Sequence, residues 1–198
     1  MAKSMRIRVE KTDCNMEPLM GKRIKLKPIE SEEDMKYLFR SFNDPIATGK
    51  YVNFKARGWQ EFQEFIKDGS KSPAHFTTFL IEKNDDKKVI GSIVYFVPWA
   101  LSVQCFEIGY GIDDPSLRRK GYASEAARLL VDYLFSMEPG LVRIQATTDI
   151  ENRGSQGVLE NVGFVKEGIT RKTTFVRGIF RDDVLYSLLR EDWKLEEV

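Results

Sequence analysis

Apolar residues recur with two different spacings along the chain. Residues 23–29 and 105–112 alternate between apolar and polar positions, which predicts strands. Strands are also predicted at residues 75–82, 89–97, 141–147 and 164–172, and at residues 184–189, which are rich in apolar residues. Every third or fourth residue is apolar in the runs that predict helices, namely residues 31–42, 58–68, 123–134 and 152–161. This order predicts an α/β domain with a central mixed, mostly antiparallel sheet flanked by helices.

Capping and turn residues separate these elements. Ser31 is followed by three acidic residues and predicts the N-cap of the first helix. Asn43-Asp44-Pro45 predicts its end, and Gly163 predicts the end of the last helix. Residues 46–57 have no clear period.

The length of 198 residues is enough for one domain with a full core. We expect residues 1–21 to be an N-terminal extension, in which residues 6–10 alternate like an edge strand. Residues 22–198 are then expected to form the single domain.

Three cations and a glycine stand between the predicted strand at 105–112 and the next helix: Arg118, Arg119, Lys120 and Gly121. The start of a helix has unpaired backbone N–H groups and the positive end of the helix dipole, so it attracts an anion. Gly121 is expected to let the backbone approach that anion without a Cβ in the way. The stretch therefore predicts a phosphate-binding strand–loop–helix, which is neither a Walker loop nor the dinucleotide fingerprint.

Charge and residue inventory narrow the classes of function. Lys+Arg 31 and Asp+Glu 30 give a net charge of +1, which argues against a dedicated nucleic-acid binder. No apolar run reaches the roughly 20 residues of a membrane-spanning helix, and no signal peptide is visible. The cysteines Cys14 and Cys105 are far apart and predict no disulfide framework, so we expect a cytoplasmic protein. The single histidine, His75, argues against a histidine-rich metal site, and we expect no metal.

The basic loop resembles a known motif. Arg118 to Ala123 fits the pattern Gln/Arg-x-x-Gly-x-Gly/Ala, which holds the pyrophosphate of acetyl-CoA in the GNAT superfamily of N-acetyltransferases. Residues 106–110 resemble the fourth core strand of its ribosomal-protein N-acetyltransferase (RimJ/RimL-like) branch. Residues 152–164 and 181–188 resemble the Asn-x-x-Ser helix and the closing strand of that branch. The resemblance covers residues 23–193 and implies the GNAT (acyl-CoA N-acyltransferase) fold.

The resemblance implies an acetyl-CoA-dependent N-acetyltransferase that releases CoA. In the family the strand corresponding to residues 105–112 splays from its neighbour, and the pantetheine arm inserts there like an extra strand. The residues implied to contact acetyl-CoA are Tyr110, Gly111, Ile112, Arg118, Arg119, Lys120, Gly121, Tyr122, Ala123 and Asn152. One departure is the pair Asp113 and Asp114, where the family often has one residue, and we expect the extra residue to bulge outward.

Glu107 is the candidate general base. It shares one side of its strand with Cys105, Gly109 and Gly111, and the two glycines leave space beside it. The attacking amine must lose a proton, which a carboxylate accepts directly or through water. A solvated strand glutamate is the alternative interpretation of Glu107.

Ser155 is the candidate general acid, because the RimJ/RimL-like branch has a serine at this position. Many other family members use a tyrosine where this chain has Leu159. An ordinary helix serine is the alternative for Ser155. Tyr186 is a third candidate acid, but we expect it to pack on the last strand.

The resemblance favours the N-terminal α-amine of a protein or peptide as acceptor. Its groove is expected between residues 50–57 and 173–181, where cations and aromatics mix: Lys50, Lys55, Arg57, Arg177, Arg181, Tyr51, Phe54, Phe175 and Phe180. That mixture is expected to suit acidic or apolar peptides better than a polyamine.

Three alternatives stay open. One is an N-acetyltransferase of a small-molecule amine such as a polyamine or aminoglycoside, and another is a non-catalytic acyl-CoA sensor. The third is a cysteine acyltransferase that uses Cys105 and His75. The sequence predicts no nucleic-acid or membrane partner and leaves a homodimer open.

Overall fold

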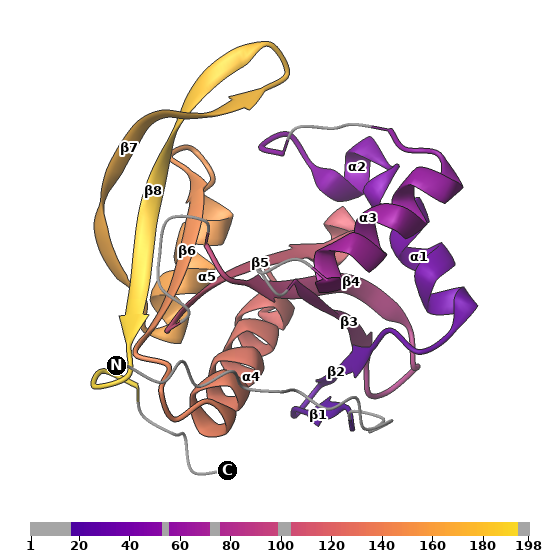
Figure 1. The fold of residues 1–198 in the computed structure, drawn as a ribbon, viewed down its shortest axis with the longest axis horizontal. Coiled ribbons are helices and arrows are strands. Elements are labelled where there is room, and N and C mark those ends of the chain that lie inside the picture. Colours follow the sequence, from indigo (N-terminus) through magenta and orange to yellow (C-terminus); the bar gives the residue numbers. More distant parts are fainter. Residues whose placement is uncertain (1–16, 53–55, 72–75, 99–103, 194–198) are drawn as a thin grey trace, which may run out of the picture.

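A computed structural model describes residues 17–52, 56–71, 76–98 and 104–193, and these form one α/β unit (Figure 1). The strands are β1 (Leu19–Met20), β2 (Ile24–Pro28), β3 (Thr77–Lys83), β4 (Val89–Phe96), β5 (Cys105–Ile112), β6 (Arg143–Asp149), β7 (Val165–Val176) and β8 (Ile179–Leu189). The helices are α1 (Glu32–Phe42), α2 (Pro45–Thr48), α3 (Trp59–Lys71), the 3₁₀ turn η1 (Pro115–Leu117), α4 (Tyr122–Met137) and α5 (Arg153–Val162).

The eight strands form one sheet in the order β1-β2-β3-β4-β5-β6-β8-β7. Neighbouring strands are antiparallel, except that β5 and β6 are parallel. The mixed, mostly antiparallel sheet with flanking helices is therefore confirmed.

Two cores cover the two faces of this sheet. On one face, α4 buries Ala127, Leu130 and Leu134 against Ile93 and Ile108. The opposite face carries a smaller core of Leu38, Phe62 and Leu80, from α1, α3 and β3. The apolar stripes that predicted these helices are thus their buried sides.

The pairing of β4 with β5 shows which face each β5 residue lies on. Tyr110 pairs with Ile93, which belongs to the α4 core. Gly111 pairs with Ser92, whose partner on β3 is Leu80 of the opposite core. Because side chains alternate along a strand, Glu107, Gly109 and Gly111 share one side of β5, as the sequence predicted, and the pairing shows that this side is the α1–α3 face.

The local end signals hold in the structure. Ser31 and Asp34 form a capping box at the start of α1, and Asn43 is its C-cap. Gly163 ends α5 in the left-handed conformation, with φ of 102°. Asp44 and Pro45 do more than end a helix, because they start the short helix α2, which the sequence did not predict.

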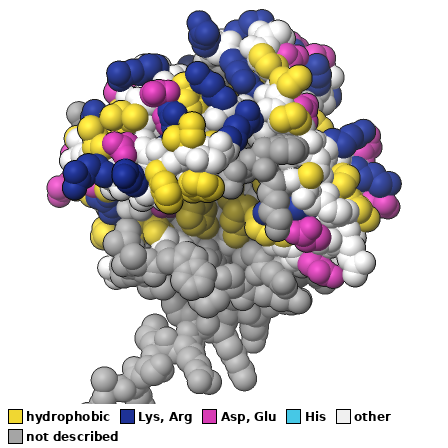
Figure 2. Space-filling view, turned by 90° about the horizontal axis from the view of Figure 1, so that it is seen from above, with side chains coloured by type: hydrophobic (Ala, Val, Ile, Leu, Met, Phe, Trp, Pro, Cys, Tyr) yellow, Lys and Arg dark blue, Asp and Glu magenta, His cyan; other side chains and the backbone are white. Residues whose placement is uncertain are grey.

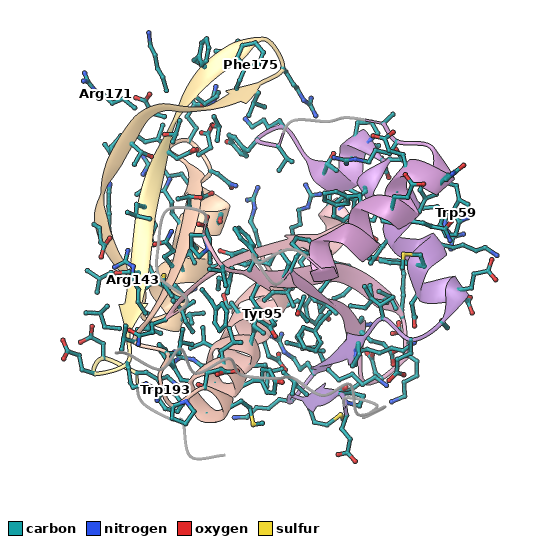
Figure 3. The ribbon with its side chains drawn as sticks, in the orientation of Figure 1. Trp59, Tyr95, Arg143, Arg171, Phe175 and Trp193 are labelled. Carbon is teal, nitrogen blue, oxygen red and sulfur yellow. The ribbon has the colours of Figure 1, made fainter. Side chains whose placement is uncertain are left out.

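The C-terminal hairpin differs most from the expectation. Residues 173–183 were expected to connect two shorter strands, but they continue β7 and β8 around a tip at Arg177 and Gly178. The hairpin extends beyond the rest of the sheet, with Phe175 near its tip (Figures 1 and 3). Leu19 and Met20, at the end of the expected extension, pair with β2. The expected strand at 6–10 lies outside the described residues.

Candidate functional site

The parallel strands β5 and β6 pair over only three positions: Cys105 with Arg143, Phe106 with Ile144, and Glu107 with Gln145. Beyond Glu107 the two strands separate, and we call this opening the fork. The backbone of β5 that borders the fork has no ladder partner on β6. Both strands run toward the open end of the fork, so the loop after β5 and the start of α5 meet there.

Glu107 lies at the closed end of the fork, held by two donors from β6. The Thr147 hydroxyl donates to Glu107 Oε1 at 2.8 Å, and Gln145 Nε2 donates to Oε2 at 3.0 Å. The two bonds fix the plane of the carboxylate. Sequence reasoning found Glu107 but missed these donors, although the polar residues Gln145, Thr147 and Asp149 recur at every second position of β6.

A chain of polar contacts extends behind Glu107. Arg143 Nε donates to Gln145 Oε1 at 3.2 Å, so the Gln145 amide turns its N–H toward Glu107. Arg143 also holds Glu167 of β7 at 2.6 and 2.7 Å, near the base of the hairpin (Figure 3). The Arg143 guanidinium and the Ser187 hydroxyl lower the pKa of Glu167 to about 2.

Ser155 approaches the fork from the other face of the sheet. The Tyr110 and Ser155 hydroxyl oxygens are 3.1 Å apart, and the Tyr110 hydroxyl also lies 3.1 Å from the Ser155 carbonyl oxygen. Burial raises the pKa of Tyr110 well above its usual range, so its hydroxyl stays protonated. The candidate base and the candidate acid therefore flank the fork from opposite faces of β5.

Two further sequence candidates have structural partners. Asn152 is the N-cap of α5, and its side chain accepts from the Ser155 N–H at 3.3 Å. Tyr186 is fully buried and donates to Glu160 at 2.9 Å, which confirms that it packs on the last strand.

The basic loop, Arg118 to Gly121, contains two left-handed residues. Arg119 has φ of 58° and Gly121 has φ of 82°. A non-glycine residue in this region is uncommon and strained, and it concentrates at functional sites. Gly121 is the N-cap of α4 and provides no side-chain cap. The first N–H groups of this 16-residue helix are thus available for an anion.

Arg23 braces this loop, and sequence reasoning missed it. Its Nη1 donates to the Lys120 carbonyl at 2.8 Å, its Nε pairs with Glu125 at 2.9 Å, and its guanidinium lies 4.9 Å from the centre of the Tyr122 ring. A Cβ on Gly121 would lie 3.0 Å from Arg23 Nη2. A side chain at position 121 would therefore point at Arg23. The reason for glycine expected from the sequence was a different one, namely the approach of the anion.

Arg118 does not extend freely from the loop. Its Nε donates to the Ile112 carbonyl at 2.9 Å. Its Nη2 donates to the carbonyls of Ile46 at 2.9 Å and Ala47 at 3.1 Å. The side chain thus joins the end of β5 to α2.

One extra residue of the pair Asp113 and Asp114 was expected to bulge outward, and Asp113 does not do so. Asp113 points at α1, where the Tyr37 hydroxyl donates to it at 2.6 Å, and burial raises the pKa of Asp113. Asp114 caps η1 by accepting from the Ser116 N–H. A pocket of about 310 Å³ adjoins Asp113 and Leu117, between α1, α2 and β4, and its lining includes neither Glu107 nor Ser155.

The charges of the segments expected to form the acceptor groove differ from the prediction. Arg181 was expected to be one of the cations of the acceptor groove, but it pairs with Asp149 at 3.0 Å and with Glu151 at 2.6 Å. These carboxylates therefore compensate its charge. Phe54, Lys55, Cys14 and His75 lie outside the described residues, so the arrangement of Cys105 with His75 stays a prediction.

Comparison with known proteins bears on this geometry. The acetyltransferase (GNAT) domain family matches residues 23–165. The chain belongs to the GNAT acetyltransferase family. It is an N-acetyltransferase, and its relatives include ribosomal-protein N-acetyltransferases.

One relative is the probable N-acetyltransferase YjcK of Bacillus subtilis, which is 33% identical over 88% of this chain and 98% of its own. Another is the [ribosomal protein uS5]-alanine N-acetyltransferase of Escherichia coli, 29% identical over 69% of each chain. The structure of ribosomal-protein-S5-alanine acetyltransferase from Vibrio fischeri superposes with a TM-score of 0.74 at 22% identity, over 91% of this chain and 100% of that one. At this identity the structural likeness shows the fold.

No group of three or more His, Cys, Asp or Glu side chains in the described part of the chain is arranged to hold a metal ion. Over the same residues, the helices are too short or too polar to cross a membrane.

Proposed function

We propose that this N-acetyltransferase moves the acetyl group of acetyl-CoA to the N-terminal α-amine of a protein or peptide. The observation that carries the proposal is the fork, with Glu107 and Ser155 on its two faces and the basic loop at its open end. The free N–H groups at the start of α4, together with Arg119 and Lys120, suit the pyrophosphate. Acetyl-CoA supplies an activated acetyl thioester when it is bound.

Each residue then has a definite task. The amine nitrogen forms a bond to the acetyl carbon, and the carbon–sulfur bond breaks. Glu107 accepts the amine proton at a carboxylate oxygen, directly or through a water. Ser155 donates its hydroxyl proton to the departing sulfur, and Tyr110 holds the Ser155 hydroxyl. The backbone of Tyr110, Gly111 and Ile112 borders the fork and lies along the pantetheine arm.

The acceptor assignment depends on amine chemistry and on the relatives. An α-amine has a pKa near 7.7–8.0 and is partly neutral at physiological pH, whereas a lysine amine titrates near 10.4. An α-amine therefore requires less of Glu107 as a base than a lysine amine does. The name of the E. coli relative gives an alanine of a ribosomal protein as its acceptor. The positive charge of Arg181 contributes less to acceptor choice than the sequence predicted, because Arg181 is paired with acids.

A substrate panel tests the proposal. Peptides with N-terminal alanine or serine, spermidine and an aminoglycoside are each incubated with acetyl-CoA, and release of the CoA thiol is measured. We expect acetylation of at least one peptide at its α-amine, located by mass spectrometry. Acetylation of spermidine or the aminoglycoside, with every peptide inert, would favour the small-molecule alternative. Acetyl-CoA binding without any transfer would favour the sensor.

Ser155→Ala tests the second catalytic role. We expect turnover to fall by less than in Glu107→Gln, which lacks the base. Acetyl-CoA affinity should change little, because the hydroxyl acts on the leaving sulfur. The matched control is Tyr110→Phe, which keeps Ser155 and removes the hydroxyl that holds it. Unchanged turnover in Ser155→Ala would show that a water, and not Ser155, protonates the leaving sulfur.

A further inference from the structure

Residues 45–52 cross from the cofactor side of the site to the acceptor side, and we call them the strap. At one end, the carbonyls of Ile46 and Ala47 accept from Arg118. At the other end, the Gly49 carbonyl accepts from Arg177 of the hairpin tip at 2.8 Å. The Tyr51 hydroxyl donates to the Glu151 carbonyl, after β6, at 2.9 Å. The strap thus joins the end of β5 to the segments beyond β6.

The strap borders an exposed surface suited to a peptide. Apolar side chains of the strap and the hairpin are exposed there, with Ile46, Val52, Phe175, Ile179 and Phe180 each more than half exposed. Figure 2 shows dark blue and yellow side chains interleaved on this end of the molecule. The position of the strap therefore determines one wall of the acceptor side.

Arg118 is the cofactor-side anchor of the strap. Its guanidinium donates to carbonyls of two segments at once, Ile112 and Asp113 on one and Ile46 and Ala47 on the other. The planar guanidinium of arginine presents several N–H donors in fixed directions, and a lysine ammonium does not reproduce this geometry. These hydrogen bonds of the guanidinium all go to backbone carbonyl oxygens.

We propose that Arg118 is a positioning residue of the acceptor wall and that its side chain does not act as a phosphate ligand. The proposal deepens the acetyl transfer proposed above and rests on it. In this arrangement the loop that binds the pyrophosphate also carries the tether of the strap. Loss of the Arg118 side chain should therefore affect the acceptor peptide more than the cofactor.

The first experiment separates the two roles by shortening the donor. Arg118→Ala and the wild type are assayed with acetyl-CoA and with S-acetyl-pantetheine, which lacks the pyrophosphate, using a peptide with N-terminal alanine. We expect the peptide KM to rise about tenfold with either donor, because the lost charge-assisted bonds act on the strap. If the defect appears with acetyl-CoA and disappears with S-acetyl-pantetheine, Arg118 is a phosphate ligand and the proposal is wrong.

Two variants are matched controls. Arg118→Lys keeps the charge beside the loop but loses the planar guanidinium, so we expect the same rise in peptide KM as in Arg118→Ala. Retention of the wild-type peptide KM in Arg118→Lys would contradict the proposal. Arg119→Ala removes the neighbouring, exposed cation, and we expect weaker acetyl-CoA binding with an unchanged peptide KM.

A second experiment does not depend on activity. Hydrogen–deuterium exchange of the strap is measured in the wild type, Arg118→Ala and Arg119→Ala, after thermal unfolding has shown that each is folded. We expect faster exchange of residues 45–52 in Arg118→Ala alone. Unchanged exchange would show that Arg118 does not hold the strap. If the wild type acetylates none of the amines, the proposed function fails, and the exchange result still decides the tether.

Discussion

The basic loop and the proposed acceptor wall are built in opposite ways. The basic loop is a short continuous stretch that offers backbone N–H groups at the start of α4. The proposed wall is assembled from the strap, the turn after β6 and the hairpin, which meet through bonds from side chains to backbone carbonyls, such as that from the Tyr51 hydroxyl to the Glu151 carbonyl. Backbone donors follow from local conformation, whereas the wall depends on which side chains each segment carries.

The difference has a consequence for function. A ligand common to all members of the family is suited to a site made of backbone atoms, because most side-chain changes leave those atoms in place. An acceptor that varies between enzymes is suited to a wall made of side chains. We therefore expect substitutions of the loop's backbone and bracing residues to alter acetyl-CoA affinity, and substitutions of the wall to alter acceptor choice.

The largest expected effect lies between the two regions, at Glu107. Glu107→Gln keeps the shape and removes the base, so turnover should fall about 10²–10⁴-fold near neutral pH. The loss should shrink as pH rises, because more of the amine is then already neutral. Steady-state kinetics across pH measure this, with acetyl-CoA affinity as the control that should not change. Full activity of the variant at neutral pH would make Glu107 a structural residue.

The next effect tests the backbone of the basic loop. Gly121→Val places a branched side chain at φ of 82° and against Arg23, so the affinity for acetyl-CoA should fall about tenfold or more. Isothermal titration with acetyl-CoA measures the loss. Gly140→Val is the matched control, because Gly140 has open space around its Cβ position and no positive φ. Equal acetyl-CoA affinities of the two variants would show that the basic loop does not bind the cofactor.

A smaller effect is expected from the brace. Arg23→Ala removes the hydrogen bond to Lys120 and the pair with Glu125, so acetyl-CoA affinity should fall about fivefold. The affinity for S-acetyl-pantetheine, which lacks the pyrophosphate, should not change. For Arg118→Ala, by contrast, the rise in peptide KM is expected with both donors. Lys22→Ala, a change of the exposed neighbour, is the control. A loss that persists with the shortened donor would place Arg23 outside the pyrophosphate site.

The smallest effect concerns stability at the base of the hairpin. Because Arg143 and Ser187 lower the pKa of Glu167 from 4.5 to about 2, the ionised form stabilises the fold above pH 4.5. That contribution should disappear as pH falls from 4.5 to 2. Chemical unfolding of wild type and Glu167→Gln should show a stability difference that narrows over this range. Glu138→Gln, at an exposed glutamate, is the control, and an equal pH dependence for both variants would contradict the pairing.

Local rules predicted much of the fold. The capping box of α1, the apolar face of α4 and the glycine that ends α5 all follow from neighbouring residues. Glu107 and the glycines of β5 share one side of the strand, as predicted, because strand alternation has a period of two. By contrast, β6 is displaced by two residues from the expected strand, and β7 and β8 continue through the residues expected to be a loop. Pairing between long strands overrode the weak local signal there.

The sequence by itself determined the basic loop, the candidate base and the order of the elements, because each depends on residues close together in the chain. Only the tertiary structure decided what holds them. Arg23 and Glu125 are 102 residues apart, Arg118 and Ile46 are 72 apart, and Tyr51 and Glu151 are 100 apart. No local period or cap specifies such pairs, since they form only when the sheet brings their segments together. The same folding leaves Arg181 paired with acids and Arg118 bonded to the strap, which their charges alone did not reveal.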